Sequence, residues 1–121
     1  MRNRKSAKAA GARFERVVAD YLAKELDDDR IDRAPKAGAK DKGDIAGVRI
    51  NGRRLVIECK DTARPNLSGW AKEADVEADN ADALTGIIVH KRHGVAKPEH
   101  QWVTMTLQSL TKILKETNHE R

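Results

Sequence analysis

The sequence contains few of the residues that build cross-linked or membrane-embedded structures. Among its 121 residues there are 1 Cys, 2 Trp, 1 Tyr and 1 Phe. A lone cysteine, Cys59, cannot form an internal disulfide or a thiolate zinc site, which excludes disulfide scaffolds and zinc fingers and fits a reducing compartment. No apolar run approaches the roughly 20 residues of a membrane span, and no apolar segment follows the basic start as in a signal peptide. We therefore expect a soluble, cytoplasmic protein without membrane contact.

Charge is what the sequence has in excess. Charged residues make up 36%, and 24 Lys and Arg outnumber 19 Asp and Glu. Residues 1–16 hold six basic residues and one acid, whereas residues 72–82 hold five acids and one lysine. The length predicts a single domain over residues 1–121, with a basic, flexible arm at 1–8 and a frayed tail at 117–121. The basic arm favours a polyanionic partner.

The hydrophobic pattern predicts alternating helices and strands. Helical periodicity runs over residues 7–26, from Ser68 onward and from Leu107 onward, and strands are expected at 31–34, 44–50, 53–60, 86–91 and 101–105. Asn51-Gly52 is the dipeptide that best tolerates the positive φ angles of a tight hairpin turn. The predicted order is α-β-β-β-α-β-β-α, an α/β fold with a mixed central sheet flanked by helices.

The residues that suggest chemistry lie on the predicted hairpin. Glu58 and Lys60 project from the same face of the strand 53–60. Glu58 follows the apolar run Leu55-Val56-Ile57, and Asp44 lies on the other strand of the hairpin. Two carboxylates on adjacent strands suit a hard divalent cation such as Mg²⁺ or Mn²⁺. A lysine beside them could orient a water molecule or stabilise charge on a phosphate. The alternative interpretation is a solvated strand face.

Hairpin geometry tests this interpretation. A strict two-residue loop at Asn51-Gly52 would place Asp44 opposite Cys59, on the wrong face for Glu58. A three-residue loop with a bulge, or a bulge near Ala46-Gly47, would bring Asp44 opposite Lys60 instead. A metal site at these residues therefore requires a bulge.

Four segments together resemble the PD-(D/E)XK nuclease superfamily and, within it, the archaeal and phage Holliday-junction resolvases. They are Phe14-Glu15-Arg16, the loop 34–39, Gly43-Asp44-Ile45 and Ile57-Glu58-Cys59-Lys60, and the resemblance spans about residues 10–105. The sequence departs from the family in having Gly43 before the aspartate where proline is usual. It also has Ala37 where resolvase loops often carry a serine.

The resemblance implies a restriction-endonuclease-like fold and a metal-dependent active site. Asp44, Glu58, Glu15 and the carbonyl of Cys59 would hold Mg²⁺, with Mn²⁺ as a substitute, and Lys60 would assist the attacking water. The implied function is a structure-specific endodeoxyribonuclease that resolves Holliday junctions as a homodimer, because paired cuts in a four-way junction need two sites. The alternatives are another repair or restriction nuclease of the same fold, and a DNA-binding module without activity.

Basic residues in three segments are the predicted DNA contacts. They would hold phosphates beside the metal without reading sequence. They are Arg2, Arg4, Lys5, Lys8 and Arg13 near the start, Lys36, Lys40 and Lys42 before Asp44, and Lys91 and Arg92 in the later loop.

Several further residues admit two interpretations. Trp70, Glu73 and Glu77 could share one helix face near the site, but we expect Trp70 to pack and the two acids to be solvated. The histidines at 90, 93 and 100 could bind zinc, although the interleaved Lys91 and Arg92 favour a basic strand end that touches phosphate. Trp102 is expected in the core rather than as a platform for base stacking.

Overall fold

The computed structural model of the chain describes residues 3–36 and 40–118. Its elements are α1 (Arg4–Glu25), β1 (Asp32–Arg33), β2 (Ile45–Ala46), β3 (Arg49–Ile50), β4 (Arg53–Lys60), α2 (Leu67–Asn80), β5 (Thr85–His90), the 3₁₀ helix η1 (Pro98–His100), β6 (Trp102–Thr104) and α3 (Leu107–Asn118). The predicted α/β class and element order are confirmed, except that the strand expected at 44–50 is divided into β2 and β3. Within the described ranges no helix has the length and apolar character needed to cross a bilayer.

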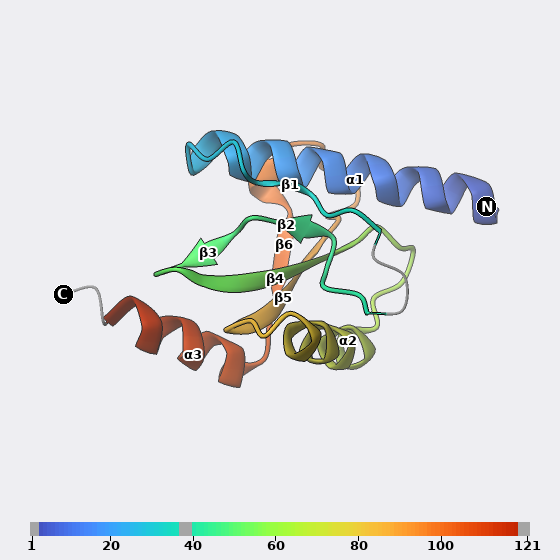
Figure 1. Ribbon diagram of the computed structural model, residues 1–121. Helices are drawn as coiled ribbons and strands as arrows, with labels where there is room; N and C mark the ends of the chain where they lie inside the picture. The colour runs from blue at the N-terminus through green and yellow to red at the C-terminus, as the bar shows by residue number, and fades with distance from the viewer. Residues whose placement is uncertain (1–2, 37–39, 119–121) are drawn as a thin grey trace.

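The sheet is mixed and lies between helices (Figure 1). Its strand order is β1-β2-β4-β5-β6, and β3 pairs with β4 beside that path. The long strand β4 runs parallel to β5, whereas the other pairings are antiparallel. Helix α1 packs over β1 and β4, α2 packs against β4 and β5, and α3 packs against β5 and β3. Figure 1 shows α1 and α2 on opposite sides of the sheet, with β4 between them.

Alternation along β4 divides its side chains between two environments. Ile57 and Cys59 enter the larger core together with Phe14 of α1. Because successive side chains on a strand point to opposite faces, Glu58 projects toward α2. There Trp70 of α2 is buried in the smaller core. The strand therefore delivers a carboxylate into the space beneath a helix.

Helix α1 begins earlier than its apolar pattern predicts. The Asn3 side chain accepts a hydrogen bond from the Ser6 amide at 2.8 Å, and the Ser6 hydroxyl accepts one from the Asn3 amide at 3.0 Å. This reciprocal cap satisfies amide groups at the helix start. Residues 4–8, part of the predicted arm 1–8, therefore form the first turns of α1, and residues 1–2 lie outside the described residues.

The other end of the chain also differs from expectation. Helix α3 continues to Asn118, so residues 117 and 118 are helical where a frayed tail was predicted. The rest of the predicted tail, 119–121, lies outside the described residues.

The hairpin turn agrees with its dipeptide signal. Ile50 pairs with Arg53 across Asn51-Gly52, whose φ angles of 53° and 81° are both positive. Such angles are those of the tight turns that match the twist of a hairpin.

Beyond this turn the register shifts by one residue. Ile45 pairs with Ile57, so Ala46-Gly47 contributes one more residue than β4 does over the same stretch. Gly47 has a φ of 92°, and a side chain there would meet the Arg30 carbonyl oxygen at 2.4 Å. The required bulge is therefore present at the expected place, but its direction is the reverse of the one predicted. It moves Asp44 toward Glu58 and not toward Lys60.

Candidate metal centre

Asp44 is held at the junction between β1 and β4 by its own backbone. Its amide donates to the Ile57 carbonyl at 2.9 Å, and its carbonyl accepts from the Ala34 amide at 2.8 Å. Its carboxylate oxygen Oδ2 accepts from the Cys59 amide at 2.8 Å. Gly43, with a φ of 95°, lets the chain turn into this position. The Asp44 carboxylate thus lies beside the segment that carries Glu58.

Glu58 and Lys60 lie on the α2 side of β4, as the alternation predicts. The Glu58 side chain is almost fully buried, and the residue is 3% exposed. The Lys60 ammonium lies 3.6 Å from Glu58 Oε2 and 2.7 Å from Glu73 Oε1. Glu73 of α2 therefore fixes the lysine beside the buried glutamate.

Glu77 of α2 is the residue that the sequence-based expectation placed wrongly. It was expected to be solvated but is 2% exposed. Glu77 follows the buried Ala74 by three residues and precedes Ala81 by four, so it belongs to the stripe of α2 that faces the sheet. That spacing is the sequence signal that could have identified it.

Asp41 brings a further carboxylate to the same place. Its Oδ1 accepts from the Gly43 amide at 2.9 Å, and its carbonyl accepts from the Asn80 side chain at 3.0 Å. One carboxylate oxygen each of Asp41, Glu58 and Glu77 lie within 4.8 Å of one another. Sequence reasoning missed Asp41, although Asp-Lys-Gly is a common turn sequence in which an aspartate bonds to its own backbone.

We call the five carboxyl groups of Asp41, Asp44, Glu58, Glu73 and Glu77 the acidic cluster. Burial raises the pKa of Glu58, and the charges of Asp44 and Glu77 raise it further. Burial also raises the pKa of Glu77, with a contribution from Asp41. For Lys60, burial acts to lower the pKa, but its contacts with Glu73 and Glu58 outweigh this and raise it. The lysine therefore stays charged and pairs with Glu58, whereas no ion pair to Glu77 is found among the described residues.

The donor atoms of this cluster fit a hard divalent cation. Glu58 Oε1 and both carboxylate oxygens of Glu77 are buried and meet no hydrogen-bond donor among the described residues. Buried carboxylates without donors are costly unless they are protonated, paired or bound to a metal. An all-oxygen donor set is the type that Mg²⁺, Mn²⁺ and Ca²⁺ prefer.

Glu15 occupies a different environment from the acidic cluster. Its Oε1 lies 3.2 Å from Arg33 Nε and its Oε2 lies 3.9 Å from Lys36 Nζ. Of the predicted site residues, the structure thus brings together Asp44, Glu58 and Lys60, while Glu15 pairs with basic side chains. Its role as a ligand stays a prediction.

The side chain of Cys59 lies in the larger core, whereas its backbone faces Asp44. The free thiol is buried in the larger core, where burial raises its pKa. Its amide binds Asp44, as described above, and the predicted use of its carbonyl as a metal ligand stays a prediction.

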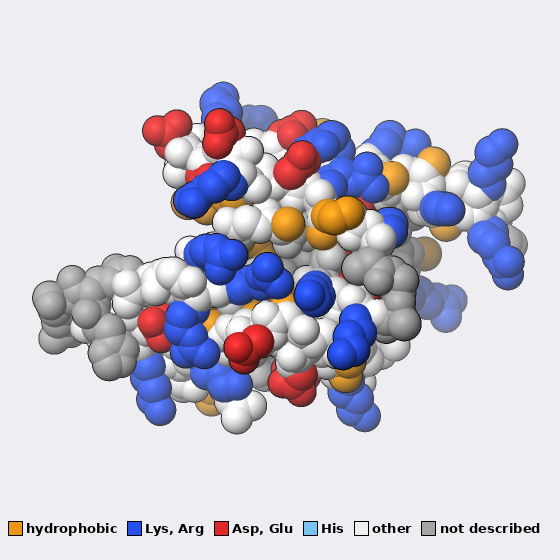
Figure 2. Space-filling model, viewed as in Figure 1, with side chains coloured by type: hydrophobic (Ala, Val, Ile, Leu, Met, Phe, Trp, Pro, Cys, Tyr) orange, Lys and Arg blue, Asp and Glu red, His pale blue; other side chains and the backbone are white. Residues whose placement is uncertain are grey.

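The predicted DNA contacts fall into two groups. Exposed basic side chains line α1 and the loop before Asp44; they are Arg4, Lys5, Lys8, Arg13, Lys36, Lys40 and Lys42. Figure 2 shows Lys and Arg side chains across this face, with a group on the projecting end of α1. Lys91 and Arg92 are partly buried, because the Lys91 ammonium donates to the Val95 carbonyl and the Arg92 guanidinium lies 4.6 Å from the centre of the Trp102 ring. Arg2 and Ala37 lie outside the described residues.

Comparison of the chain with family models, with curated proteins and with solved structures finds no match.

Proposed function

We propose that this protein is a metal-dependent endodeoxyribonuclease that cuts branched DNA, as the Holliday-junction resolvases of the PD-(D/E)XK superfamily do. The observation that carries the proposal is the pair of buried glutamates, Glu58 and Glu77, beside a charged lysine: Glu58 Oε1 and both carboxylate oxygens of Glu77 meet no hydrogen-bond donor among the described residues. A module that only binds phosphate has no use for buried carboxyl groups beside its polyanionic partner. The order of Asp44, Glu58 and Lys60 along the chain, which resembles the family motif, adds support.

Each residue of the site has a distinct task in this proposal. Glu58, with Asp44, Glu77 and Asp41, would hold Mg²⁺ or Mn²⁺, and the Cys59 carbonyl would complete the set of ligands. A divalent cation bound there supplies charge that stabilises the phosphate and lowers the pKa of a bound water. Lys60 stays protonated, so it serves to orient the water and to stabilise negative charge, not as a general base. Glu73 positions Lys60 through its 2.7 Å ion pair.

DNA would be held by the exposed basic side chains of α1 and of the loop before Asp44. Phosphate contacts from α1 and from the loop before Asp44 would position a strand without reading its sequence. Selectivity would then depend on the shape of the DNA.

We propose that the active form is a homodimer. A four-way junction needs two cuts related by symmetry, which a two-fold dimer provides. The exposed leucines of α3, Leu107, Leu110 and Leu114, supply an apolar surface of the kind that dimers bury. Sedimentation of wild type and of a Leu110→Glu variant checks this, since an unchanged molecular weight would exclude α3 from the dimer contact.

The experiment that tests the activity compares a labelled plasmid, a linear duplex and an immobile four-way junction in Mg²⁺. Glu58→Gln and Asp44→Asn should abolish cleavage while DNA binding remains, because each removes a metal ligand and leaves the basic side chains in place. Glu25→Gln, an exposed glutamate at the end of α1, is the matched control and should cut normally. Normal cleavage by Glu58→Gln would exclude the proposed site.

Binding measured in Ca²⁺, which suppresses cutting, and cleavage measured in Mg²⁺ together separate a resolvase from the two alternative functions. A preference of at least tenfold for the junction over duplex, about 1.4 kcal/mol, supports a resolvase. Equal affinity with cleavage of duplex at a short fixed sequence would favour a restriction-type nuclease. Binding without any cleavage would favour a DNA-binding module.

A further inference from the structure

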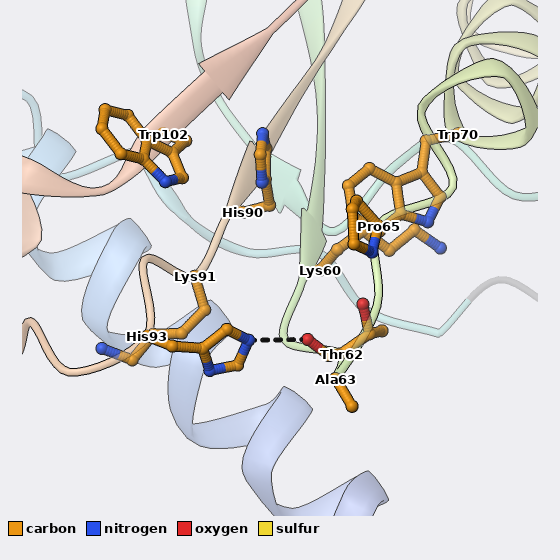
Figure 3. Close-up of a pocket in the computed structure, with 9 residues that line it drawn as sticks. All are labelled: Lys60, Thr62, Ala63, Pro65, Trp70, His90, Lys91, His93 and Trp102. Atoms are coloured by element: carbon orange, nitrogen blue, oxygen red, sulfur yellow. Dashed lines mark hydrogen bonds between the residues drawn. The ribbon is translucent and has the colours of Figure 1, made fainter.

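A concave pocket opens beside the acidic cluster, at the end of β4 and β5 where Lys60 and His90 pair in register (Figure 3). Its volume is about 200 Å³. Pockets for drug-sized ligands are larger, at about 300–1,000 Å³. The space therefore suits one flat ring system, not an extended molecule.

The pocket is lined by aromatic rings. Trp70 and His90 have ring centres 5.2 Å apart and planes inclined by 55°. His90 pairs in register with Trp102 on the edge strand β6. Trp102 was expected in the core but is 49% exposed, because no further strand covers β6 in the described sheet. Figure 3 shows the two tryptophans on either side of His90.

Hydrogen bonds fix the rings and the rim. His90 Nε2 lies 2.7 Å from the Thr104 hydroxyl, and His93 Nε2 lies 2.8 Å from the Thr62 carbonyl, which links the two loops that border the pocket. The Arg92 guanidinium stacks over the Trp102 ring, as noted above. The pocket is therefore built before a ligand arrives, which lowers the entropic cost of binding.

The surroundings of the pocket define the ligand. Lys60 lines it and also contacts Glu58, so the pocket and the acidic cluster share a wall. His93 adds an imidazole at the rim, and the stem of Lys91 lines the pocket while its ammonium binds the Val95 carbonyl. Flat aromatic surfaces beside cationic groups are what proteins use to stack the bases of single-stranded nucleic acids. Within a duplex the faces of each base are covered by its neighbours, so a base must be unpaired to enter.

We propose that this pocket binds one unpaired nucleobase of the DNA strand whose phosphate meets the acidic cluster. This inference rests on the proposed function and narrows its substrate to DNA with unpaired nucleotides next to the cut. Trp102 supplies the accessible stacking surface, since Trp70 is buried against the sheet. The Arg92 guanidinium stacks on the Trp102 ring and would place a positive charge beside the bound DNA strand.

The test measures binding in Ca²⁺ to two DNAs of equal length, a full duplex and a duplex interrupted by a short unpaired segment carrying 2-aminopurine. Wild type should prefer the interrupted DNA and quench the fluorescence of the analogue. Trp102→Ala should weaken that binding about tenfold, because stacking on an aromatic side chain contributes this order of affinity. Its affinity for duplex should change less than twofold, and Trp102→Phe should restore most of the loss. Val103→Ala, the exposed neighbour on the same strand, is the control.

A second experiment changes the DNA and uses the same two proteins. An abasic nucleotide placed at the quenched position should remove the wild-type preference and make wild type and Trp102→Ala equal. Equal weakening of Trp102→Ala on both DNAs, or no weakening at all, would overturn the pocket assignment. Cleavage remains a separate readout: binding as expected without cleavage contradicts the proposed nuclease alone, and normal cleavage with unchanged Trp102→Ala affinity contradicts the pocket alone.

Discussion

Helices α1 and α2 each bring a glutamate toward the sheet, and the two carboxylates differ in whether a basic side chain lies beside them. Glu15 of α1 lies between Arg33 and Lys36, so the protein supplies its own cations. Glu77 of α2 is buried with neither carboxylate oxygen near a donor of the described chain. The first arrangement is complete as it stands. No basic side chain pairs with the second among the described residues, and this difference is why we propose the α2 side of the sheet as the cation site.

The largest effect that follows from this comparison concerns cation affinity. Glu77→Gln should weaken Mn²⁺ binding at least about tenfold, because even residues that only support metal ligands contribute 10–100-fold. Glu15→Gln should change it less than twofold, because Arg33 and Lys36 already neutralise that carboxylate. Asp79→Asn, on the exposed face of α2, controls for the loss of an acid. Calorimetric titration of the free proteins measures all three.

If Glu15→Gln weakens Mn²⁺ binding as much as Glu77→Gln, the comparison fails. Glu15 would then leave its ion pairs and join the metal, as the family resemblance implies. If neither variant changes the affinity, the acidic cluster is not a metal site.

The second effect is a dependence of cation stabilisation on pH. Burial raises the pKa of Glu77 to about 8 and that of Glu58 to about 10, above the ordinary value of 4.5. Between pH 4.5 and these values the folded chain holds protons that the unfolded chain has released. Without a cation, stability should therefore fall as pH rises through this window. Mg²⁺ binds the ionised carboxylates, so it should raise the melting temperature more at pH 8 than at pH 5.

Thermal melts with and without Mg²⁺ at both pH values check this expectation. Glu77→Gln should reduce both the fall in stability and the Mg²⁺ effect, whereas Asp79→Asn should leave them unchanged. An identical Mg²⁺ effect at the two pH values would show that the buried carboxyls are not the groups involved.

Sequence reasoning succeeded where local rules decide the structure. The Asn51-Gly52 turn follows from the φ angles that this dipeptide tolerates, and the alternation of β4 places Glu58 and Lys60 on one face. The bulge was required by the metal hypothesis, but its direction depends on Gly47 approaching the Arg30 carbonyl, a contact between distant segments. Contacts between distant segments cannot be predicted from the periodicity of residues within one segment.

The errors on acids and aromatics have the same origin. Glu77 was expected in solvent because the surrounding residues 72–82 are acidic, although its spacing from Ala74 places it on the buried stripe. Trp102 was expected in the core because it belongs to an apolar strand segment with Val103 and Met105. Both predictions followed residue type. Glu77 is buried because α2 packs against the sheet, and Trp102 is exposed because β6 is the edge strand.

The smallest effect concerns the basic end of α1. Arg4, Lys5 and Lys8 are exposed on a capped helix, so their charges can be removed without deleting the helix start. If all three contact phosphates, the variant Arg4→Gln, Lys5→Gln, Lys8→Gln should flatten the dependence of log affinity on log salt by up to about 2.7, since each contact contributes about 0.9 on duplex DNA. Because such contacts do not read structure, affinities for junction and duplex should fall together. Lys24, Lys112 and Lys115, also exposed on helices, provide the matched triple control. A salt slope equal to that of the control would show that α1 does not touch DNA, and a selective loss on the junction would show that its charges recognise the branch.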